Sequence, residues 1–475
     1  MKLTGFLLLA AVLLGFIAWH RAPEYDEAYS IFLTAGDARP PWPAGVFTAG
    51  SVRHLFAGHA GFGQIAHDLR VGDVHPPLYF WALEIWRGVC GPSWFAARRL
   101  SVAFALGALA VIAWFADAAE IAVLPALSLT LLNYGFAFTG VVARGFALAQ
   151  FLNLLGFALV FFAVQKRMRR LALAGGLALG AAAFANYLAV FIAGAVLAWL
   201  CLARRRWRYF LPTALGLVPF LIADTWFFIA QRGTRTGQFT AFVPLQALKL
   251  LAKDFGAAQF GGLPLYASHF GPEVAAALGV LFLAAIFCIF RKPPKHALPL
   301  VLAAAAPPLG LLALGFVFNN TPIEIRYLAF SMPYLALLFA AALPRPLLAV
   351  MLTVEFCAII GLGFAPATMQ PQGIEAQQAA ALPGTLILLP FGNDGVGVPG
   401  PFISKLPDSA RVELLRPGQM PDLAHVPNIV LVTIPADSAS RAALAQVHAY
   451  LQNQKCFTEE PATTWLVKLL NRCAN

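Results

Sequence analysis

The chain has little charge and few cysteines for its length. Only 12% of its 475 residues are Asp, Glu, Lys or Arg, whereas 60% are hydrophobic. Apolar runs of about 17–25 residues, the length that crosses the hydrocarbon core of a bilayer, recur along most of the sequence and argue against a soluble protein. The cysteines and histidines show no spacing typical of a zinc site. The composition therefore predicts a polytopic membrane protein.

The net charge of +11 is explained by topology. Basic clusters lie in short hinges between apolar runs, at residues 166–170, 204–208 and 291–295. Cytoplasmic loops carry such an excess of Lys and Arg, so we expect no nucleic-acid partner. The first apolar run lacks a small-x-small cleavage site, which favours a retained signal-anchor with a cytoplasmic N-terminus.

About eleven spans can be assigned by length. They leave two long external loops, residues 21–99 and 231–271, and an external C-terminus. Leu78 to Val89 is short for a span and suits a helix in the membrane interface. The predicted spans are residues 3–20, 100–116, 121–140, 146–165, 171–186, 187–203, 209–228, 272–290, 297–318, 327–343 and 346–364.

The character of the chain changes after residue 365. Apolar runs at 384–389, 428–432 and 464–470 read as strands, and residues 438–454 read as an amphipathic helix. We therefore predict a membrane domain, residues 1–365, and a small soluble α/β domain, residues 366–475. If that domain is exported, Cys456 and Cys473 can form a disulfide.

Three carboxylates follow the first span, in Glu24-Tyr25-Asp26-Glu27. A carboxylate near hydrocarbon is costly unless it is solvated, paired or used, so these acids are candidates for function. The alternative is an ordinary solvated loop start. We expect Asp26 and Glu27 on an extended loop, where neighbouring side chains point to opposite sides. One carboxylate then faces a pocket as a general base, while the other binds a neighbouring lysine, arginine or backbone donor.

His75 lies in the same loop, before Pro76 and Pro77, which fix an extended turn and permit a helix from Leu78. Alone, His75 is more simply a cap of that helix. Near Asp26, it would bind an acceptor or a leaving phosphate.

Two arginines occupy equivalent places at the predicted external face. Arg144 lies between two apolar runs, and Arg326 precedes Tyr327 at the start of a late span. Either reaches toward lipid headgroups or holds the phosphate of a lipid-linked substrate. Asp224 lies inside a span near its outer end, where a substrate-binding role and a capping or water-facing role are equally open. Glu355 is better explained as structural.

The order of these motifs resembles the C-type, polyprenyl-phosphate-sugar-dependent glycosyltransferases. Among them, the bacterial branch related to protein O-mannosyltransferases and to the aminoarabinose transferases of lipid A is the most similar. The resemblance covers residues 1–365. The matching segments are Tyr25-Asp26-Glu27-Ala28-Tyr29, Asp73-Val74-His75-Pro76-Pro77-Leu78-Tyr79, Ala143-Arg144-Gly145-Phe146-Ala147-Leu148 and Ile325-Arg326-Tyr327-Leu328.

The resemblance implies an all-α polytopic enzyme of the bacterial inner membrane, with its active face in the periplasm. It implies a hexosyl- or pentosyltransferase in which Asp26, with Glu27 as second choice, deprotonates an acceptor hydroxyl and the anomeric centre is inverted. The donor is a polyprenyl-phosphate sugar, and the acceptor a lipid, glycan or protein. Members often carry an acid before the arginine and a His-Tyr pair, where this chain has Val141-Val142-Ala143 and Asn186-Tyr187. We therefore predict no required metal or other cofactor.

Two other classes of protein remain open. A flippase for lipid-linked sugars should have paired broken helices and polar groups near the membrane midplane, whereas the polar residues of this chain gather at one face. An envelope scaffold would not need Asp26, Arg144 and Arg326 to converge.

Overall fold

The protein is described by a computed structural model, which covers residues 3–235, 239–365, 376, 379, 385–423, 426–434, 437–453, 457–459 and 467–472. Its contacts divide the chain into two compact units. Unit 1 comprises Met1–His20, Ala66–Ala82 and Arg98–Thr368. Unit 2 comprises Arg21–Ile65, Leu83–Ala97 and Met369–Asn475. Large parts of the first predicted loop thus group with the C-terminal region, while the predicted boundary at residue 365 stays a prediction.

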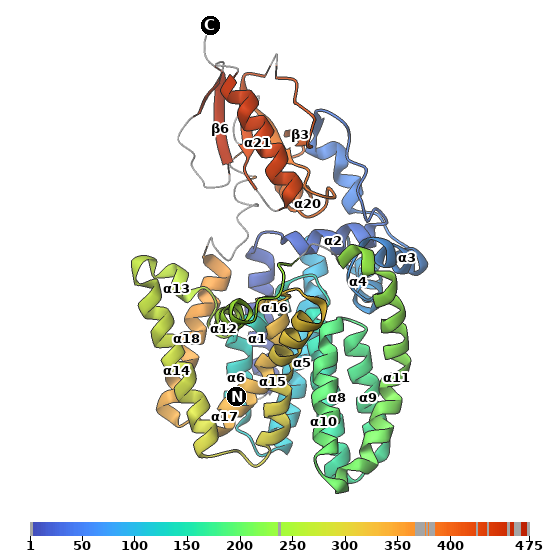
Figure 1. Ribbon diagram of the computed structural model, residues 1–475, viewed down its shortest axis with the longest axis vertical. Coiled ribbons are helices and arrows are strands. Elements are labelled where there is room, and N and C mark those ends of the chain that lie inside the picture. Colours follow the sequence, from blue (N-terminus) through green and yellow to red (C-terminus); the bar gives the residue numbers. More distant parts are fainter. Residues whose placement is uncertain are drawn as a thin grey trace. The chain divides into compact units, whose positions relative to one another are not determined.

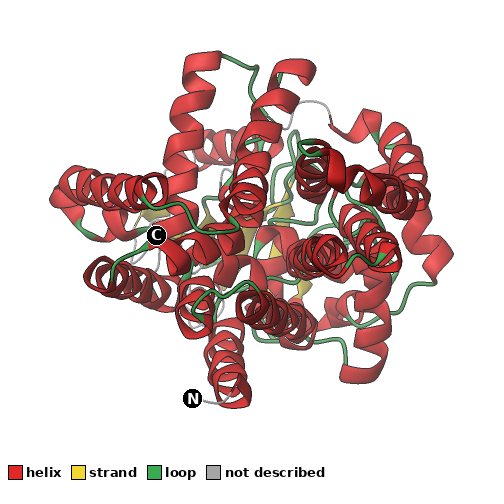
Figure 2. Cartoon of the chain, turned by 90° about the horizontal axis from the view of Figure 1, so that it is seen from below, coloured by secondary structure: helices red, strands yellow, loops and turns green. Residues whose placement is uncertain are grey.

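Long apolar helices dominate unit 1, and Figure 2 looks along many of them. Helices α8, α9, α10 and α11 pack beside one another (Figure 1). Among the described residues, eight helices are long and apolar enough to cross a membrane, so the chain is a multi-pass membrane protein. They lie within Leu3–His20 (α1), Trp94–Ala118 (α5), Phe146–Lys166 (α8), Arg204–Ala230 (η3 and α11), Ser268–Arg291 (η5 and α14), Ala297–Phe318 (α15), Ile325–Ala342 (α16, η6 and α17) and Arg345–Phe364 (α18).

The predicted count of eleven spans is not confirmed. Two predicted spans correspond to the short helices α9 (Arg169–Ala183) and α10 (Val190–Cys201). A third is broken into α6 (Val123–Leu132) and α7 (Tyr134–Val141), which are bent by 65°. Asn133 causes the break, because it adopts an extended conformation and its side chain accepts the Phe136 backbone N–H at 3.1 Å, which caps α7.

Unit 2 contains a six-stranded mixed sheet in the order β1-β3-β2-β4-β6-β5. Strand β2 lies parallel to β3 and β4, and the other pairs are antiparallel. Helix α21 (Ser438–Asn453) packs against β2 and β3 through apolar side chains such as Val447 and Leu451. The strands are β1 (Phe47–Thr48), β2 (Thr385–Pro390), β3 (Arg411–Leu415), β4 (Asn428–Val432), β5 (Phe457–Glu459) and β6 (Val467–Arg472).

These elements confirm the predicted fold class, a helical membrane protein with a small α/β domain. Strands β2 and β4 and helix α21 match their predictions within one residue, and the predicted helix from Leu78 is α4 (Leu78–Cys90). Cys456 and Cys473 lie outside the described residues. The remaining elements are α2 (Tyr25–Ala35), η1 (Ala49–Phe56), α3 (Phe62–Gly72), η2 (Tyr187–Ala189), η4 (Arg232–Arg235), α12 (Pro244–Phe260), α13 (Leu263–Tyr266) and α20 (Pro399–Lys405).

Candidate functional site

Asp26 and Glu27 lie in the first turn of helix α2, so the prediction that they occupy an extended loop is wrong. A capping box starts the helix: the Glu24 backbone N–H donates to Glu27 Oε2 at 2.8 Å, and Arg21 holds the Glu24 side chain at 2.5 Å. Glu27 is fully buried in this role, whereas Asp26 is half-buried. The capping box therefore gives Glu27 a structural function and leaves Asp26 as the stronger candidate for a base.

The same helix is fixed to the C-terminal part of unit 2. Tyr25 and Tyr29, one turn apart, share a hydroxyl contact at 3.1 Å, and the Tyr29 hydroxyl donates to Asp394 Oδ2 at 2.9 Å. Burial raises the pKa of both tyrosines, so their hydroxyls stay protonated at neutral pH. Gly397 lies against the Tyr25 ring, where an added Cβ would come within 2.2 Å of a ring carbon.

In unit 1, a buried charged cluster forms around His75. Its Nδ1 lies 2.7 Å from Asp73 Oδ1 and 3.3 Å from Arg144 Nη2, and Arg144 lies 4.0 Å from Asp73 Oδ2. The shorter contact identifies Nδ1–H as a donor to Asp73, because a ring nitrogen cannot donate and accept at once. Burial raises the pKa of Asp73, but Arg144 and His75 lower it further, to well below its usual range. Asp73 therefore stays ionised at neutral pH, and its carboxylate orients the side chains of His75 and Arg144.

The backbone brings this cluster together through tight contacts. Gly145, directly after Arg144, lies so close to Ala185 that a Cβ would come within 2.4 Å of its carbonyl oxygen. Gln231, fully buried, donates from Nε2 to the carbonyl oxygens of Leu69 and His75, each at 2.9 Å. The placement of His75 therefore depends on a residue 156 positions away in the sequence.

Arg144 is only 4% exposed, which does not fit an arginine that extends toward lipid headgroups. Arg326 is a quarter exposed and its Nε lies 2.5 Å from Glu324 Oε2. Its guanidinium lies 5.3 Å from the centre of the Tyr327 ring. The ring of Phe146, two residues after Arg144, also packs against the Tyr327 ring, with 6.2 Å between the ring centroids.

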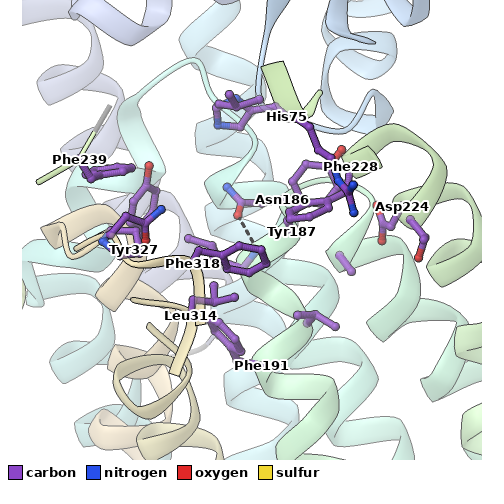
Figure 3. Close-up of a pocket in the computed structure, with 18 of the residues that line it drawn as sticks. His75, Asn186, Tyr187, Phe191, Asp224, Phe228, Phe239, Leu314, Phe318 and Tyr327 are labelled. Carbon is purple, nitrogen blue, oxygen red and sulfur yellow. Dashed lines mark hydrogen bonds between the residues drawn. The ribbon is translucent and has the colours of Figure 1, made fainter. Parts of the chain in front are cut away.

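A cavity of about 670 Å³ opens beside these residues within unit 1. Its polar lining includes His75, Asn186, Tyr187, Asp224, Arg232 and Tyr327, and Phe191, Phe228 and Phe318 contribute apolar walls (Figure 3). Such a volume with few polar groups in an apolar wall is typical of a binding site for a small molecule or part of a lipid.

The structure therefore brings His75, Arg144, Arg326, Tyr327 and Asp224 together in unit 1, while Asp26 and Glu27 belong to unit 2. Two contributors were missed from the sequence as site residues, Asp73 and Gln231. Asp73 stands in the matched motif and was detectable there, whereas nothing local marks Gln231. Among the described residues, no group of three or more His, Cys, Asp or Glu is placed to hold a metal ion. Independence from metals and other cofactors stays a prediction.

Comparison of the sequence with protein-family models and with curated proteins finds no match. The structure is similar to crystal structures of ArnT from Cupriavidus metallidurans. With the form bound to undecaprenyl phosphate, the TM-score is 0.53 at 16% identity over 99% of this chain and 98% of that one. With the apo form, the TM-score is 0.52 at 14% identity over the same shares. The arabinofuranosyltransferase AftD from Mycobacteria gives a TM-score of 0.47 at 14% identity, over 99% of this chain and 40% of that one.

The likeness to ArnT covers both chains almost completely, so the two proteins share a fold. This agrees, at the level of the fold, with the resemblance that the motifs indicated.

Proposed function

We propose that the protein is an integral membrane glycosyltransferase that moves a sugar from a polyprenyl-phosphate donor to an acceptor hydroxyl. The observation that carries the proposal is the buried Asp73–His75–Arg144 cluster, which stands with Arg326 and Tyr327 beside a cavity of about 670 Å³. Arginine side chains, whose planar guanidinium groups bind phosphate oxygens through paired N–H donors, suit a lipid phosphate beside such a cavity. ArnT, which shares the fold, was crystallised with undecaprenyl phosphate.

The chemistry is a single displacement at the anomeric carbon. Asp26 takes the proton of the acceptor hydroxyl, whose oxygen attacks the anomeric carbon. The bond from that carbon to the phosphate oxygen breaks, and the electron pair leaves with the polyprenyl phosphate. Arg144 and Arg326 stabilise the charge that develops on the phosphate, and His75 binds the phosphate or acceptor. Displacement in one step inverts the anomeric configuration.

We further propose that the reaction takes place at the periplasmic face of a bacterial inner membrane, with the N-terminus in the cytoplasm. The basic hinges between the helices support this orientation. The acceptor is a lipid, glycan or protein, the sugar a hexose or pentose, and the reaction uses no metal.

The test is a transfer assay with the purified protein in lipid nanodiscs. Extracted polyprenyl-phosphate sugars are supplied with membrane extracts as acceptors, and mass spectrometry follows the mass of a transferred sugar. We expect wild-type protein to release polyprenyl phosphate together with glycosylated acceptor, and Asp26→Asn to form neither. Absence of both products for every donor and acceptor would contradict the proposal.

A flippase for lipid-linked sugars is the main rival, and one observation bears on it. Helices α6 and α7 form a broken pair, and a transporter should have such discontinuous helices in related halves. In the described ranges this is the only bent pair found. Proteoliposomes loaded with a fluorescent polyprenyl-phosphate sugar separate the two, because a flippase moves the intact donor between leaflets without releasing polyprenyl phosphate.

A further inference from the structure

Asp224 is a buried acidic residue that lines the cavity. It lies in the second half of helix α11 (Trp207–Ala230) and is only 7% exposed. Neither of its side-chain oxygens has a hydrogen-bond partner in the part of the chain that the structure describes. Most buried polar side chains are hydrogen-bonded, so this carboxyl requires an explanation.

Contact with an apolar ligand would not explain the buried carboxyl of Asp224. Burial of a polar group without a hydrogen bond costs free energy, and the cost is largest in the hydrocarbon region, where an acid is rarely retained without function. An isoprenoid chain has no hydrogen-bond donor. If the lipid tail lay against Asp224, the carboxyl would remain unsatisfied when the cavity is filled.

The position of Asp224 within the cavity points to a different part of the ligand. In Figure 3, Asp224 and Tyr327 lie on opposite sides of the cavity, with Asn186 and Tyr187 between them. Arg326 lies on the Tyr327 side, with its guanidinium 5.3 Å from the centre of the Tyr327 ring. The cavity thus has a side that favours an anion and, opposite to it, a carboxyl group whose oxygens have no hydrogen-bond partner among the described residues.

Asn186 and Tyr187, which lie between these two sides, already form hydrogen bonds within the protein. The Tyr187 hydroxyl donates to Gln231 Oε1 at 2.9 Å, and Asn186 Oδ1 accepts the Leu188 backbone N–H at 3.1 Å. These bonds fix the orientation of both side chains. Among the described lining residues, the two oxygens of Asp224 and Asn320 Oδ1 are the acceptors left for a ligand, and of these residues only Asp224 lies in α11.

We propose that Asp224 recognises the sugar of the donor by accepting hydrogen bonds from its hydroxyl groups. This inference rests on the proposed function and adds that the cavity distinguishes a polyprenyl-phosphate sugar from the bare polyprenyl phosphate that the reaction releases. Asp224 thereby favours binding of substrate over product, because the product has no sugar hydroxyls to satisfy it.

The experiment measures binding without turnover, in the absence of acceptor. The probes are a short-chain polyprenyl phosphate and the same lipid carrying a hexose or a pentose. Dissociation constants are measured in nanodiscs for wild-type protein, Asp224→Asn and Asp224→Leu. Folding is not at risk in Asp224→Leu, since the change removes a buried, unsatisfied carboxyl, and replacement of such groups by apolar ones is often neutral or stabilising.

We expect wild-type protein to bind at least one sugar-carrying lipid more tightly than the bare phosphate. Asp224→Leu should lose about ten- to a hundredfold in affinity for the sugar-carrying lipid, the effect of leaving a buried hydrogen-bonding group of the ligand without its partner, and bind the bare phosphate as before. Asp224→Asn should bind the sugar-carrying lipid with an affinity between those of wild-type protein and Asp224→Leu. The matched control is Glu355→Gln, which changes another buried carboxyl, in α18, that does not line the cavity and is held by Gln259. It should preserve both affinities.

The two hypotheses fail in different ways. If wild-type protein binds neither the bare nor the sugar-carrying lipids, the proposed function fails and this inference fails with it. If wild-type protein binds the lipids without preference for a sugar, sugar recognition is wrong. If Asp224→Leu keeps the preference, or loses affinity for bare and sugar-carrying lipids alike, the assignment of Asp224 is wrong while the lipid-phosphate site stands.

Discussion

The Tyr29 hydroxyl donates a hydrogen bond to Asp394 Oδ2 at 2.9 Å, joining residues 365 positions apart. Tyr29 lies on the helix that carries Asp26, and Asp394 lies on the loop after strand β2. Gly397 lies against Tyr25 on the same helix. The C-terminal part of unit 2 therefore determines how the candidate base is held within that unit.

Removal of this hydrogen bond should loosen α2 within unit 2. We expect Tyr29→Phe to lower the free energy of unfolding by about 1–2 kcal/mol, because a partly buried bond to a charged group is lost while the ring still packs. Thermal unfolding in nanodiscs measures the change, and limited proteolysis between residues 36 and 46 reports the loosening.

Asp408→Asn is the control for that prediction. Asp408 is mostly exposed and pairs with Arg53 at 2.9 Å, also between the first loop and the C-terminal region. Exposed pairs contribute about 0–1 kcal/mol. Equal destabilisation by the two variants would show that the Tyr29–Asp394 bond has no special role.

Asp26→Asn should abolish transfer while the protein stays folded. The change removes the proton acceptor and keeps the shape, and loss of a general base costs on the order of 10²–10⁴ in rate. Initial rates of transfer, measured beside the thermal unfolding midpoint, test this. A variant with nearly normal turnover would exclude Asp26 as the base.

Glu27 variants should separate charge from capping. Glu27→Gln retains an oxygen that can accept the Glu24 N–H, so both transfer and stability should be largely kept. Glu27→Ala should lower stability by about 1 kcal/mol or more through loss of the cap. If Glu27→Gln instead stopped transfer in folded protein, Glu27 would be the base.

Replacement of Arg144 or Arg326 by Gln should weaken binding of the donor phosphate by about ten- to a hundredfold. Replacement by Lys should restore only part of the affinity for the donor phosphate, since an ammonium group cannot reproduce the planar, paired N–H donors of a guanidinium. Arg144→Gln should also destabilise the protein, because it leaves Asp73 buried beside His75 alone. The double variant Asp73→Asn/Arg144→Gln should regain stability but not donor affinity. Unchanged donor affinity in both single Gln variants would contradict the phosphate site.

Donor binding should depend on pH through Glu324. Burial and the nearby charge of Asp254 raise the pKa of Glu324 from 4.5 to about 7. Between these values the folded protein keeps a proton that the unfolded chain has lost, so the free energy of unfolding falls as pH rises through this window. Below pH 7 the neutral carboxyl competes less for Arg326, which lies 2.5 Å away, and the donor should bind more tightly.

The measurement compares donor dissociation constants at pH 6 and pH 8. Wild-type protein should bind more tightly at pH 6, on the order of tenfold, the equivalent of one pKa unit. Glu324→Gln should bind tightly at both values, because the donor is a phosphodiester whose charge does not change in this range. An equal pH dependence in both proteins would exclude Glu324 as the titrating group.

The orientation can be tested with single cysteines in a background without native cysteines. Ser51→Cys and Gln419→Cys, both at exposed positions, should react with an impermeant thiol reagent from the periplasm, and Arg205→Cys should not. Gly50 is less suitable than Ser51, because a Cβ there would come within 2.8 Å of Asp408. The reverse labelling pattern would place the active face in the cytoplasm.

Local patterns in the sequence predicted most elements but not their lengths or breaks. Apolar runs identified the long helices and strands β2 and β4. Hydropathy alone gives no sign that Asn133 caps a new helix inside an apolar run, so the span predicted over residues 121–140 was continuous. It likewise cannot separate α9 and α10 from full spans, because the residues directly after each helix, Phe184-Ala185 and Leu202-Ala203, are also apolar.

The candidate site was predictable where a residue type is unusual for its surroundings. His75, Arg144, Arg326 and Asp224 stand out in apolar sequence, and the structure gathers them. Gln231 was not predictable, because its two bonds to backbone carbonyls depend on how distant segments meet. The role of Glu27 in a capping box was overlooked, although a Glu three residues after Glu24 is a local signal for one.

The two-residue strand β1 has a consequence for biosynthesis. Phe47 and Thr48 pair with β3, which the ribosome reaches only after making all the membrane helices. At about 5–20 residues per second, the first loop waits roughly 20 to 70 seconds for its partner. During that time Trp42 lacks its hydrogen bond to the Gly395 carbonyl oxygen, and Phe47 lacks its pairing with Val412. A chain truncated before β3 should therefore leave the edge of β1 without its strand partner for good.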